Sequence, residues 1–515
     1  MAAKPAILAL DQGTTSTRAM LFDRDGAVLG IAQEELPQSF PREGWVEHDA
    51  ERIWADTLSV GRRVLAQAHG LDVKAVGITN QRETTVVWDR ASGRPIHPAI
   101  VWQDRRGAAA CRALQDAGHE PLLRARTGLL ADSYFSATKL QWLLDHVPGA
   151  REAAAAGRLA FGTIDSFLIW RLTGGRVHAT DATNASRTLL FDIHRQGWDK
   201  DLLALFRVPA VILPKVLDNA DDYGVTDPAH FGRAIPIRGV AGDQHAALFG
   251  QACFAPGMVK STYGTGCFVL ANVGETAPAP ANGLITTLAY RLRGKPVYAV
   301  EGSSFNAGTA IKWLRDELRL IRSAGESETL ARSLPESRGV YFVPAFTGLG
   351  APHWDAEARG AIFGLGRDTS VAEIVRAGLE SVCFQTRDLL DAMDAALDGT
   401  SGAPQARTVR VDGGMVANDW LMQSLADIID RPVERPPNVE TTALGAAWLA
   451  GLGVGLFSSL NEIGRTWRME RRFMPAMDAS VRLNALRGWR NAVARVRDFG
   501  ARRDQGPGGA PGISQ

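Results

Sequence analysis

Cysteine is scarce in this sequence and forms no metal-binding or disulfide pattern. Four cysteines occur in 515 residues, and no two of them make a Cys-x-x-Cys pair. Such pairs are typical of zinc sites, and dense cysteine frameworks are typical of small secreted domains. The scattered spacing argues against both, so we expect reduced thiols and a cytoplasmic protein.

The sequence also lacks an excess of either charge and lacks long apolar runs. The 57 basic and 56 acidic residues leave a net charge of +1, so we expect no general attraction to nucleic acid or to an anionic membrane. No apolar run reaches the roughly 18 residues of a membrane span, and no secretory signal follows Met1. With 45% apolar residues and roughly 150 residues per domain, the chain should fold into two or three globular domains, or two large ones.

Two common phosphate-binding motifs are absent as well. The chain contains neither G-x-x-x-x-G-K-[ST] nor G-x-G-x-x-G, which argues against P-loop and Rossmann-type nucleotide binding. It contains instead a loop from Asp11 to Arg18, set between the strand-like runs 6–10 and 17–23. This pattern predicts a β-hairpin, and a third strand is expected over 27–33.

The loop from Asp11 to Arg18 has the residue types that a triphosphate needs. Gly13 lets phosphate oxygens approach backbone N–H groups, and the hydroxyls of residues 14 to 17 add donors. Asp11 could hold Mg²⁺ through water, because Mg²⁺ prefers oxygen ligands and keeps its waters. The alternative is a hairpin turn with a polar tip and no ligand.

A second Gly/Thr turn occurs about half the chain later. Residues 257–261 lead into Thr-Tyr-Gly-Thr-Gly at 262–266, and a strand-like run follows over 267–272. We therefore predict two domains of related architecture, 1–250 and 251–503, each presenting a hairpin to a shared cleft. The Gly- and Pro-rich segment 504–515 is predicted to be a disordered tail.

Strands and helices alternate through most of the chain, which favours an α/β fold. Helices are predicted over 49–68 with Asp49 as N-cap, from the capping box at 370–373, over 419–429, and over 442–452, where small residues permit close packing. Strands are predicted over 73–78, 84–88 and 408–411, with a loop over 398–405.

Three further segments are candidates for chemistry. Asp412-Gly-Gly414, with Asn418 just beyond, could let a flat adenosine approach the backbone; the alternative is a plain strand–helix turn. Asp243 follows an apolar run and could act as a general base; the alternative is an N-cap for a helix over 244–250.

The third segment is Asn80-Gln-Arg-Glu-Thr84, a charged pair beside apolar strands. Arg82 can donate to a hydroxyl and Glu83 can accept from one, which suits a polyol. Neighbours on a regular strand face opposite sides, so both can reach one substrate only if the backbone is irregular here. The alternative is a salt-bridged surface loop.

In order and spacing, these segments resemble the FGGY carbohydrate kinases of the actin-like ATPase superfamily. The resemblance covers about residues 5 to 500 and is closest to members that phosphorylate glycerol. It is carried by ALDQGTTS at 9–16, GWVEHD at 44–49, GITNQRETT at 77–85, AIVWQ at 99–103, TDATNASR at 180–187, AGDQ at 241–244, TYGTGCF at 262–268 and VPAFTGLGAP at 343–352.

The resemblance implies a fold, an activity and a set of site residues. The fold would be α/β, with two actin-like (ribonuclease H-like) ATPase domains flanking a central cleft. The activity would be Mg²⁺- and ATP-dependent phosphorylation of glycerol to sn-glycerol 3-phosphate in glycerol catabolism, by a dimer or tetramer. The implied residues are Asp243 as general base; Arg82, Glu83, Tyr134, Asp243, Gln244, Trp102 and Phe268 for glycerol; Thr14, Thr15, Ser16, Arg18, Thr265, Gly308, Gly414 and Asn418 for the nucleotide; and Asp11 for Mg²⁺.

Some positions depart from the family pattern. Ser133, His245 and Lys312 replace the residues that are usual there. Segments 230–236 and 474–481 do not match the regions that some members use for inhibition by fructose 1,6-bisphosphate or by a sugar-transport regulator, so neither regulation is assumed.

Two rival functions remain open from the sequence. One is an FGGY kinase of another substrate, such as a pentulose or gluconate, which would share the phosphate loops. The other is a non-enzymatic nucleotide switch like actin or a heat-shock chaperone, which would need no polyol pocket.

Overall fold

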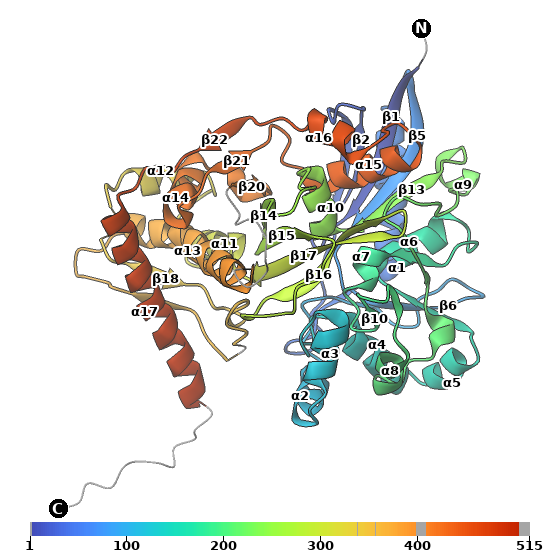
Figure 1. Cartoon of the computed structure of the whole chain (residues 1–515), viewed down its shortest axis with the longest axis horizontal. Helices are drawn as coiled ribbons and strands as arrows, with labels where there is room; N and C mark the ends of the chain where they lie inside the picture. The colour runs from blue at the N-terminus through green and yellow to red at the C-terminus, as the bar shows by residue number, and fades with distance from the viewer. Residues whose placement is uncertain (1–2, 337, 356, 398–407, 504–515) are drawn as a thin grey trace, which may run out of the picture.

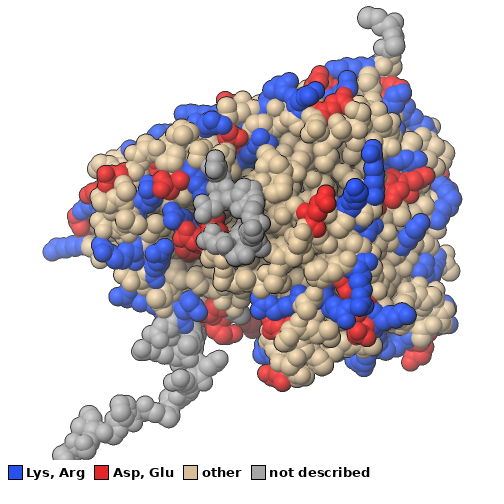
Figure 2. All heavy atoms as spheres, in the orientation of Figure 1, with Lys and Arg blue, Asp and Glu red and all other residues tan. Residues whose placement is uncertain are grey.

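The computed structural model describes residues 3–336, 338–355, 357–397 and 408–503 and has two lobes, each built around a β-sheet (Figure 1). The predicted loop over 398–405 and the predicted tail over 504–515 lie outside these residues. On the face shown in Figure 2, basic and acidic side chains are interspersed.

The first sheet has five strands in the order β13-β5-β1-β2-β3. They are β1 Lys4–Gln12, β2 Ser16–Phe22, β3 Val28–Glu35, β5 Leu71–Asn80 and β13 Ile237–Gly242. The strands predicted over 6–10, 17–23, 27–33 and 73–78 are confirmed. β1 and β2 are antiparallel and form the predicted first hairpin, with its turn at 13–15, whereas β5 and β13 run parallel to their neighbours.

Both faces of this sheet are buried, which explains why β1 is apolar at successive positions. Leu8 and Leu10 pack in one core with helices α1 (Ala50–Leu65) and α6 (Ile164–Leu172). Ile7 and Ala9 pack in another core with α10 (Asp243–Gly250) and α15 (Thr441–Gly453). Because side chains alternate along a strand, a strand covered on both faces needs apolar residues throughout.

Helix α15 belongs to the C-terminal half of the chain but packs on the first sheet. A Cβ added at Gly77 in β5 would lie 2.2 Å from the carbonyl oxygen of Ala446, and one added at Gly445 would lie 1.8 Å from that of Ala246 in α10. The predicted close packing of this helix is therefore confirmed. It brings Glu440, just before α15, beside the first hairpin.

Between β5 and β13 the chain forms a helical insertion with short strands. Besides α6, its elements are β6 Val86–Asp89, β7 Ala99–Ile100, α2 Ala108–Asp116, α3 Glu120–Thr127, α4 Ser136–His146, α5 Ala150–Ala155, β8 Leu159–Gly162, β9 Ala179–Asp181, α7 Ala182–Ala185, β10 Phe191–Asp192, β11 Gly197–Trp198, α8 Lys200–Leu205, η1 Ala210–Ile212, β12 Lys215–Leu217 and α9 Pro228–Phe231. The short strand β4 Glu47–His48 precedes β5 and pairs with β7. Asp49 caps α1 as predicted, although that helix ends at Leu65 rather than at residue 68.

The second sheet has seven strands in the order β16-β17-β15-β14-β20-β21-β22. They are β14 Val259–Tyr263, β15 Cys267–Gly274, β16 Ile285–Leu292, β17 Lys295–Ser304, β20 Val409–Asp412, β21 Val433–Arg435 and β22 Arg471–Phe473. β14 and β15 are antiparallel and form the predicted second hairpin, with its turn at 264–266.

Helices and a short strand pair surround the second sheet. They are α11 Gly308–Asp316, α12 Glu326–Arg332, β18 Tyr341–Val343, β19 Ala361–Phe363, α13 Val371–Leu397, η2 Gly414–Ala417, α14 Asp419–Ile429 and α17 Ala479–Arg503. The remaining helix, α16 Leu460–Thr466, lies beside α15 and the first sheet. The capping box is confirmed at α13, where Ser370 N donates to Glu373 Oε2 at 2.9 Å. None of the helices in the described part of the chain has the length and hydropathy that a bilayer crossing requires.

Candidate active site

A pocket of about 190 Å³ lies where the two hairpins approach each other. Both hairpins line it, together with the segment after β5, the start of α10 and two aromatic residues of the insertion. The predicted site residues that line it are Thr14, Thr15, Arg82, Glu83, Trp102, Tyr134, Asp243, Gln244, Thr265 and Phe268. The structure thus brings ten of the predicted residues, from both halves of the chain, to one cavity.

The backbone after β5 is irregular at the point where the charged pair stands. Glu83 has a φ of 61°, in the left-handed region that side chains rarely adopt. The sequence predicts an irregular backbone here, because only then can both side chains reach one substrate. The structure confirms that irregularity. Arg82 is 2% exposed and Glu83 is 1% exposed, so the alternative of a salt-bridged surface loop is wrong.

Two further charged residues hold this pair in a buried ring. Arg82 donates through Nη1 and Nη2 to the two carboxylate oxygens of Glu301, at 2.6 and 2.9 Å. Arg187 donates through Nε to Glu83 Oε1 at 2.6 Å and through Nη2 to Glu301 Oε1 at 3.2 Å. Glu301 lies in β17 of the second sheet, so the ring joins the two halves of the molecule.

The charges in this ring support one another. Burial alone would raise the pKa of Glu301, but Arg187 and Arg82 hold that pKa below its ordinary value. Burial raises the pKa of Glu83, and the same two arginines oppose the rise. Each buried charge has a partner of opposite sign, which offsets part of the cost of burying it.

Sequence reasoning missed Glu301 as a site residue and assigned no role to Arg187. Arg187 closes the run TDATNASR, and Glu301 is a single acid after the apolar run 297–300. A charged residue beside an apolar strand was the signal that singled out Arg82, and the same signal could have found Glu301.

Asp243 faces the pocket from the first residue of α10. The N-cap of this helix is Gly242, so the alternative role of Asp243 as the cap is wrong. Arg82 Nε lies 3.1 Å from Asp243 Oδ1, and the aspartate side chain is 28% exposed. Burial raises the pKa of Asp243, while Arg82 acts against the rise. The carboxylate is therefore accessible, partly desolvated and able to accept a proton.

Aromatic side chains form a wall of the pocket. The Trp102 ring lies edge-on to Tyr134, with centroids 5.5 Å apart, and to Phe268, with centroids 6.2 Å apart. Trp102 Nε1 donates to Thr14 Oγ1 at 2.9 Å, and Arg82 Nη2 donates to the Tyr134 hydroxyl at 3.3 Å. The wall therefore connects the first hairpin to the charged ring.

Asp11, Ser16 and Arg18 belong to the strands of the first hairpin and do not line the pocket. Gly13 N donates to Ser16 O at 2.9 Å and closes the turn. Arg18 is the cross-strand partner of Asp11, and its guanidinium pairs with Glu440. Burial raises the pKa of Asp11 to about 7, Arg18 opposes this rise, and Glu440 and Asp243 add to it.

The residues here fit a magnesium ion that keeps most of its water. Asp11 offers one buried carboxylate next to the phosphate-type turn, and Mg²⁺ is commonly held by one or two carboxylates plus substrate phosphates. Across the described ranges, no three His, Cys, Asp or Glu side chains group as a cage for a metal.

The second hairpin contacts the start of α11. Gly308 N donates to Gly264 O at 3.0 Å, and Ala307 N donates to Thr265 O at 3.0 Å. A Cβ at Gly308 would lie 2.5 Å from Gly264 O, so the approach requires glycine. The partial positive charge of a helix N-terminus is thereby brought to a turn with backbone donors.

Gly414 and Asn418 lie outside the pocket, beyond the second hairpin. Gly414 begins η2, and the preceding Gly413 has a φ of 90° with its Cβ position 2.6 Å from Tyr263 O. Asn418 caps α14, accepting from Leu421 N at 2.9 Å. The turn that contains Gly414 therefore lies beside the second hairpin, and Asn418 begins the helix that follows it.

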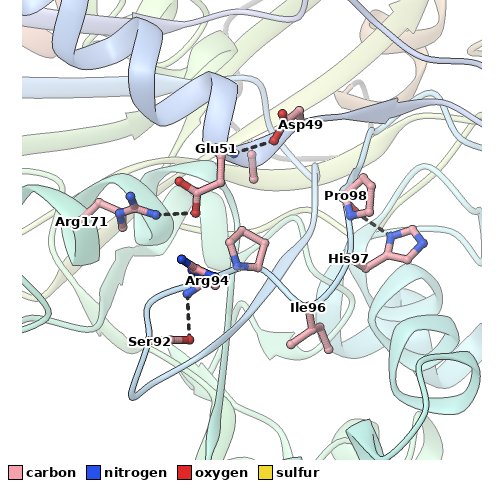
Figure 3. A pocket seen from close by; sticks show the side chains of 10 residues that line it. Asp49, Glu51, Ser92, Arg94, Ile96, His97, Pro98 and Arg171 are labelled. Atoms are coloured by element: carbon pink, nitrogen blue, oxygen red, sulfur yellow. Dashed lines mark hydrogen bonds and ion pairs between the residues drawn. The ribbon is translucent and has the colours of Figure 1, made fainter.

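A larger hollow, of about 740 Å³, lies elsewhere, at the start of α1. Figure 3 shows Glu51 and Arg171 pointing toward each other there, and their atoms Oε1 and Nη1 are 2.7 Å apart. Asp49, Arg94 and His97 also line this hollow. The predicted residues converge on the smaller pocket instead, so chemistry rather than volume locates the site.

Comparison with known proteins is consistent with this arrangement. Residues 6–250 match the N-terminal domain model of the FGGY family of carbohydrate kinases, and residues 259–454 match its C-terminal domain model. The chain is 61% identical to a glycerol kinase of Alcanivorax borkumensis, over 96% of this chain and 98% of that protein. It is 60% identical to glycerol kinase 1 of Pseudomonas aeruginosa, over 95% and 99%.

Solved structures show the same similarity. Plasmodium falciparum glycerol kinase with ADP has a TM-score of 0.88 and 35% identity, covering 96% of this chain and 98% of that one. Gluconate kinase of Lactobacillus acidophilus, at 21% identity, has a TM-score of 0.83 over 97% and 99% and shares the fold. The expected α/β fold with two actin-like domains is confirmed, and the chain belongs to the FGGY family of carbohydrate kinases.

Proposed function

We propose that this chain transfers the γ-phosphate of ATP to a terminal hydroxyl of glycerol, giving sn-glycerol 3-phosphate and ADP. The observation that carries the proposal is the buried set of Arg82, Glu83, Tyr134 and Asp243 beside two Gly/Thr hairpins. Relatives at 60 to 61% identity over almost the whole chain are named glycerol kinases, which supports the substrate.

The polyol side of the pocket offers complementary donors and acceptors. Arg82 donates, Glu83 and Asp243 accept, and the Tyr134 hydroxyl does either. Trp102 and Phe268 supply an apolar wall for a short carbon chain. A pocket of about 190 Å³ with this lining suits a small polyol better than an extended sugar.

Asp243 is the proposed general base. It accepts the proton of the attacking hydroxyl as the oxygen–phosphorus bond forms, while the bond to the ADP oxygen breaks and ADP leaves. The guanidinium of Arg82, 3.1 Å from Oδ1, favours the ionised carboxylate that this step needs. Positioning and charge neutralisation, rather than covalent chemistry, are what phosphoryl transfer requires.

The nucleotide side would be held mostly by backbone and hydroxyl groups. Thr14, Thr15 and Ser16 of the first hairpin, with Arg18, face the phosphates in this proposal, and Thr265 and Gly308 approach from the second half. Gly414 and Asn418 hold the adenosine. Bound Mg²⁺ would neutralise phosphate charge, and Asp11 is the residue that would hold it.

The proposal extends to the organisation of the protein. Residues 1–250 and 251–503 are proposed as its two domains, supported by the two sheets and two hairpins. We propose a homo-oligomer, a dimer or a tetramer, working in the cytoplasm, where ATP is available and thiols such as the four free, buried cysteines stay reduced.

The test is ADP release by the purified protein with MgATP and a panel of polyols and sugars. We expect glycerol to have the highest kcat/KM. Preference for xylulose or gluconate would replace the substrate, and ATP hydrolysis that no polyol stimulates would favour a nucleotide switch.

A further inference from the structure

A buried lysine lies beneath the pocket and has no part in the function proposed above. Lys260 in β14 is 0% exposed. Its ammonium donates to Gln244 Oε1, to Thr262 Oγ1 at 2.9 Å and to Phe268 O at 3.3 Å. An ammonium has three donors and no acceptor, so these contacts use its whole donor set.

This arrangement determines which way the Gln244 carboxamide faces. A carboxamide has an acceptor end, Oε1, and a donor end, Nε2. Because an ammonium can only donate, it selects the acceptor end and leaves Nε2 as the end available to the pocket, which Gln244 lines. Without Lys260, the two ends could exchange.

We propose that Lys260 is a positioning residue that fixes the Gln244 carboxamide with its NH₂ group toward the hydroxyl oxygen of the polyol. This inference rests on the proposed function. A hydroxyl that gives its proton to Asp243 has an oxygen free to accept, and Gln244 follows Asp243 in the first turn of α10. A donor at that place recognises the nucleophilic oxygen, and an acceptor there would repel it.

Charged groups from four segments face Lys260. They are Asp412 in β20, Arg82 after β5, Glu301 in β17 and Asp243 in α10. Burial lowers the pKa of Lys260 to about 8, and Asp412 is the largest influence against this shift. A neutral amine can accept a hydrogen bond, so the orientation of Gln244 should loosen as the pH rises above that value.

The sharpest test is Gln244→Glu, measured as KM for glycerol. If Lys260 selects the acceptor end, one carboxylate oxygen pairs with the lysine and the other presents an acceptor where a donor is needed. We expect KM for glycerol to rise about tenfold, the effect of one lost hydrogen bond, with KM for ATP within about twofold. An unchanged KM for glycerol would show that the acceptor end already faces the polyol and would overturn the proposal.

A second pair of variants separates positioning from stability. Lys260→Met should raise KM for glycerol by a smaller but measurable factor, because the carboxamide can then still present Nε2 in one of its two orientations. The matched control Lys295→Met, at an exposed position of β17, should not raise it. In a Gln244→Leu background, Lys260→Met should add no further increase in KM, because the lysine acts through Gln244. Additive effects would mean that Lys260 is only structural, and would overturn the proposal.

The failures of the two proposals are distinguishable. If the wild type converts glycerol and Gln244→Glu leaves KM unchanged, only the role of Lys260 is wrong. If the wild type converts no glycerol, the proposed substrate is wrong, and the same comparison made with the polyol of highest kcat/KM decides the orientation. Should Lys260→Met fail to fold, Gln244→Glu decides alone, since that variant keeps the lysine.

Discussion

The two sides of the pocket are built in different physical ways. On the polyol side, Arg82, Glu83, Arg187 and Glu301 are at most 2% exposed and each is paired. On the nucleotide side, Thr15 and Thr265 are exposed at hairpin tips, and close approaches such as Gly308 to Gly264 are made by the backbone. Under the proposed function, specificity for the polyol therefore depends on buried charge, and binding of the nucleotide depends on glycine geometry.

The largest effect that this contrast predicts is at Asp243. Asp243→Asn keeps the shape of the side chain but removes the base, so kcat should fall about 10²- to 10⁴-fold. The Kd of ADP, measured by calorimetry, should stay the same, because the nucleotide side does not use this carboxylate. Asp222→Asn, at an exposed aspartate, is the control, and near-normal turnover of Asp243→Asn would refute the assigned base.

Breaking the buried ring should cost stability as well as glycerol binding. Glu301→Gln leaves Arg82 and Arg187 without their shared carboxylate, so we expect the free energy of unfolding to fall by about 3 kcal/mol or more. Denaturant unfolding measures this. Glu34→Gln, which removes the partner of Arg63 in an exposed pair, should cost less than about 1 kcal/mol. Equal losses of unfolding free energy in the two variants would mean that the buried ring stabilises the protein no more than an exposed ion pair does.

On the nucleotide side, adding a single methyl group should weaken the binding of ATP and leave the binding of glycerol unchanged. In Gly308→Ala the new Cβ would lie 2.5 Å from Gly264 O, so α11 and the second hairpin must separate. We expect KM for ATP to rise about tenfold, through roughly 1 to 2 kcal/mol of lost contact, while the Kd of glycerol is unchanged.

Gly197→Ala is the matched control, since a Cβ there meets open space. A rise in the Kd of glycerol in Gly308→Ala that equals the rise in KM for ATP would contradict the separation of the two sides.

The smallest effect is a shift in the acid limb of kcat/KM. Burial raises the pKa of Asp243 above its ordinary value of 3.8, and Arg82 counteracts the rise. The base is therefore active above this raised pKa and is lost as the pH falls through it. Arg82→Lys keeps the positive charge, but an ammonium cannot pair with Asp243 and Glu301 at once as the planar guanidinium does. The pKa of Asp243 should therefore rise, and the acid limb of kcat/KM should move to higher pH. A shift to lower pH would show that Arg82 does not hold the carboxylate in its ionised form.

The sequence predicted local structure well where periodicity and turn chemistry decide it. Both hairpins, the Asp49 cap and helix 419–429 follow from alternation, glycine placement and capping residues. The irregular backbone at Glu83 could also be anticipated, because two adjacent side chains had to reach one substrate.

Contacts between distant segments could not be predicted in the same way. Glu301 meets Arg82 from 219 positions away in the chain, and Glu440 meets Arg18 from 422 positions away. No local pattern encodes such pairs, since they depend on how β17 and α15 pack on the first half. The same holds for Lys260, whose contact with Gln244 depends on how β14 lies against α10.

The most direct measurement follows the transferred phosphoryl group itself. The protein is incubated with glycerol, Mg²⁺ and ATP labelled in the γ-phosphate, and the products are separated. We predict that the label appears in sn-glycerol 3-phosphate in proportion to the ADP formed, and that Asp243→Asn loses this transfer. Label released as inorganic phosphate at the same rate with and without glycerol would contradict a buried polyol site that supplies the acceptor.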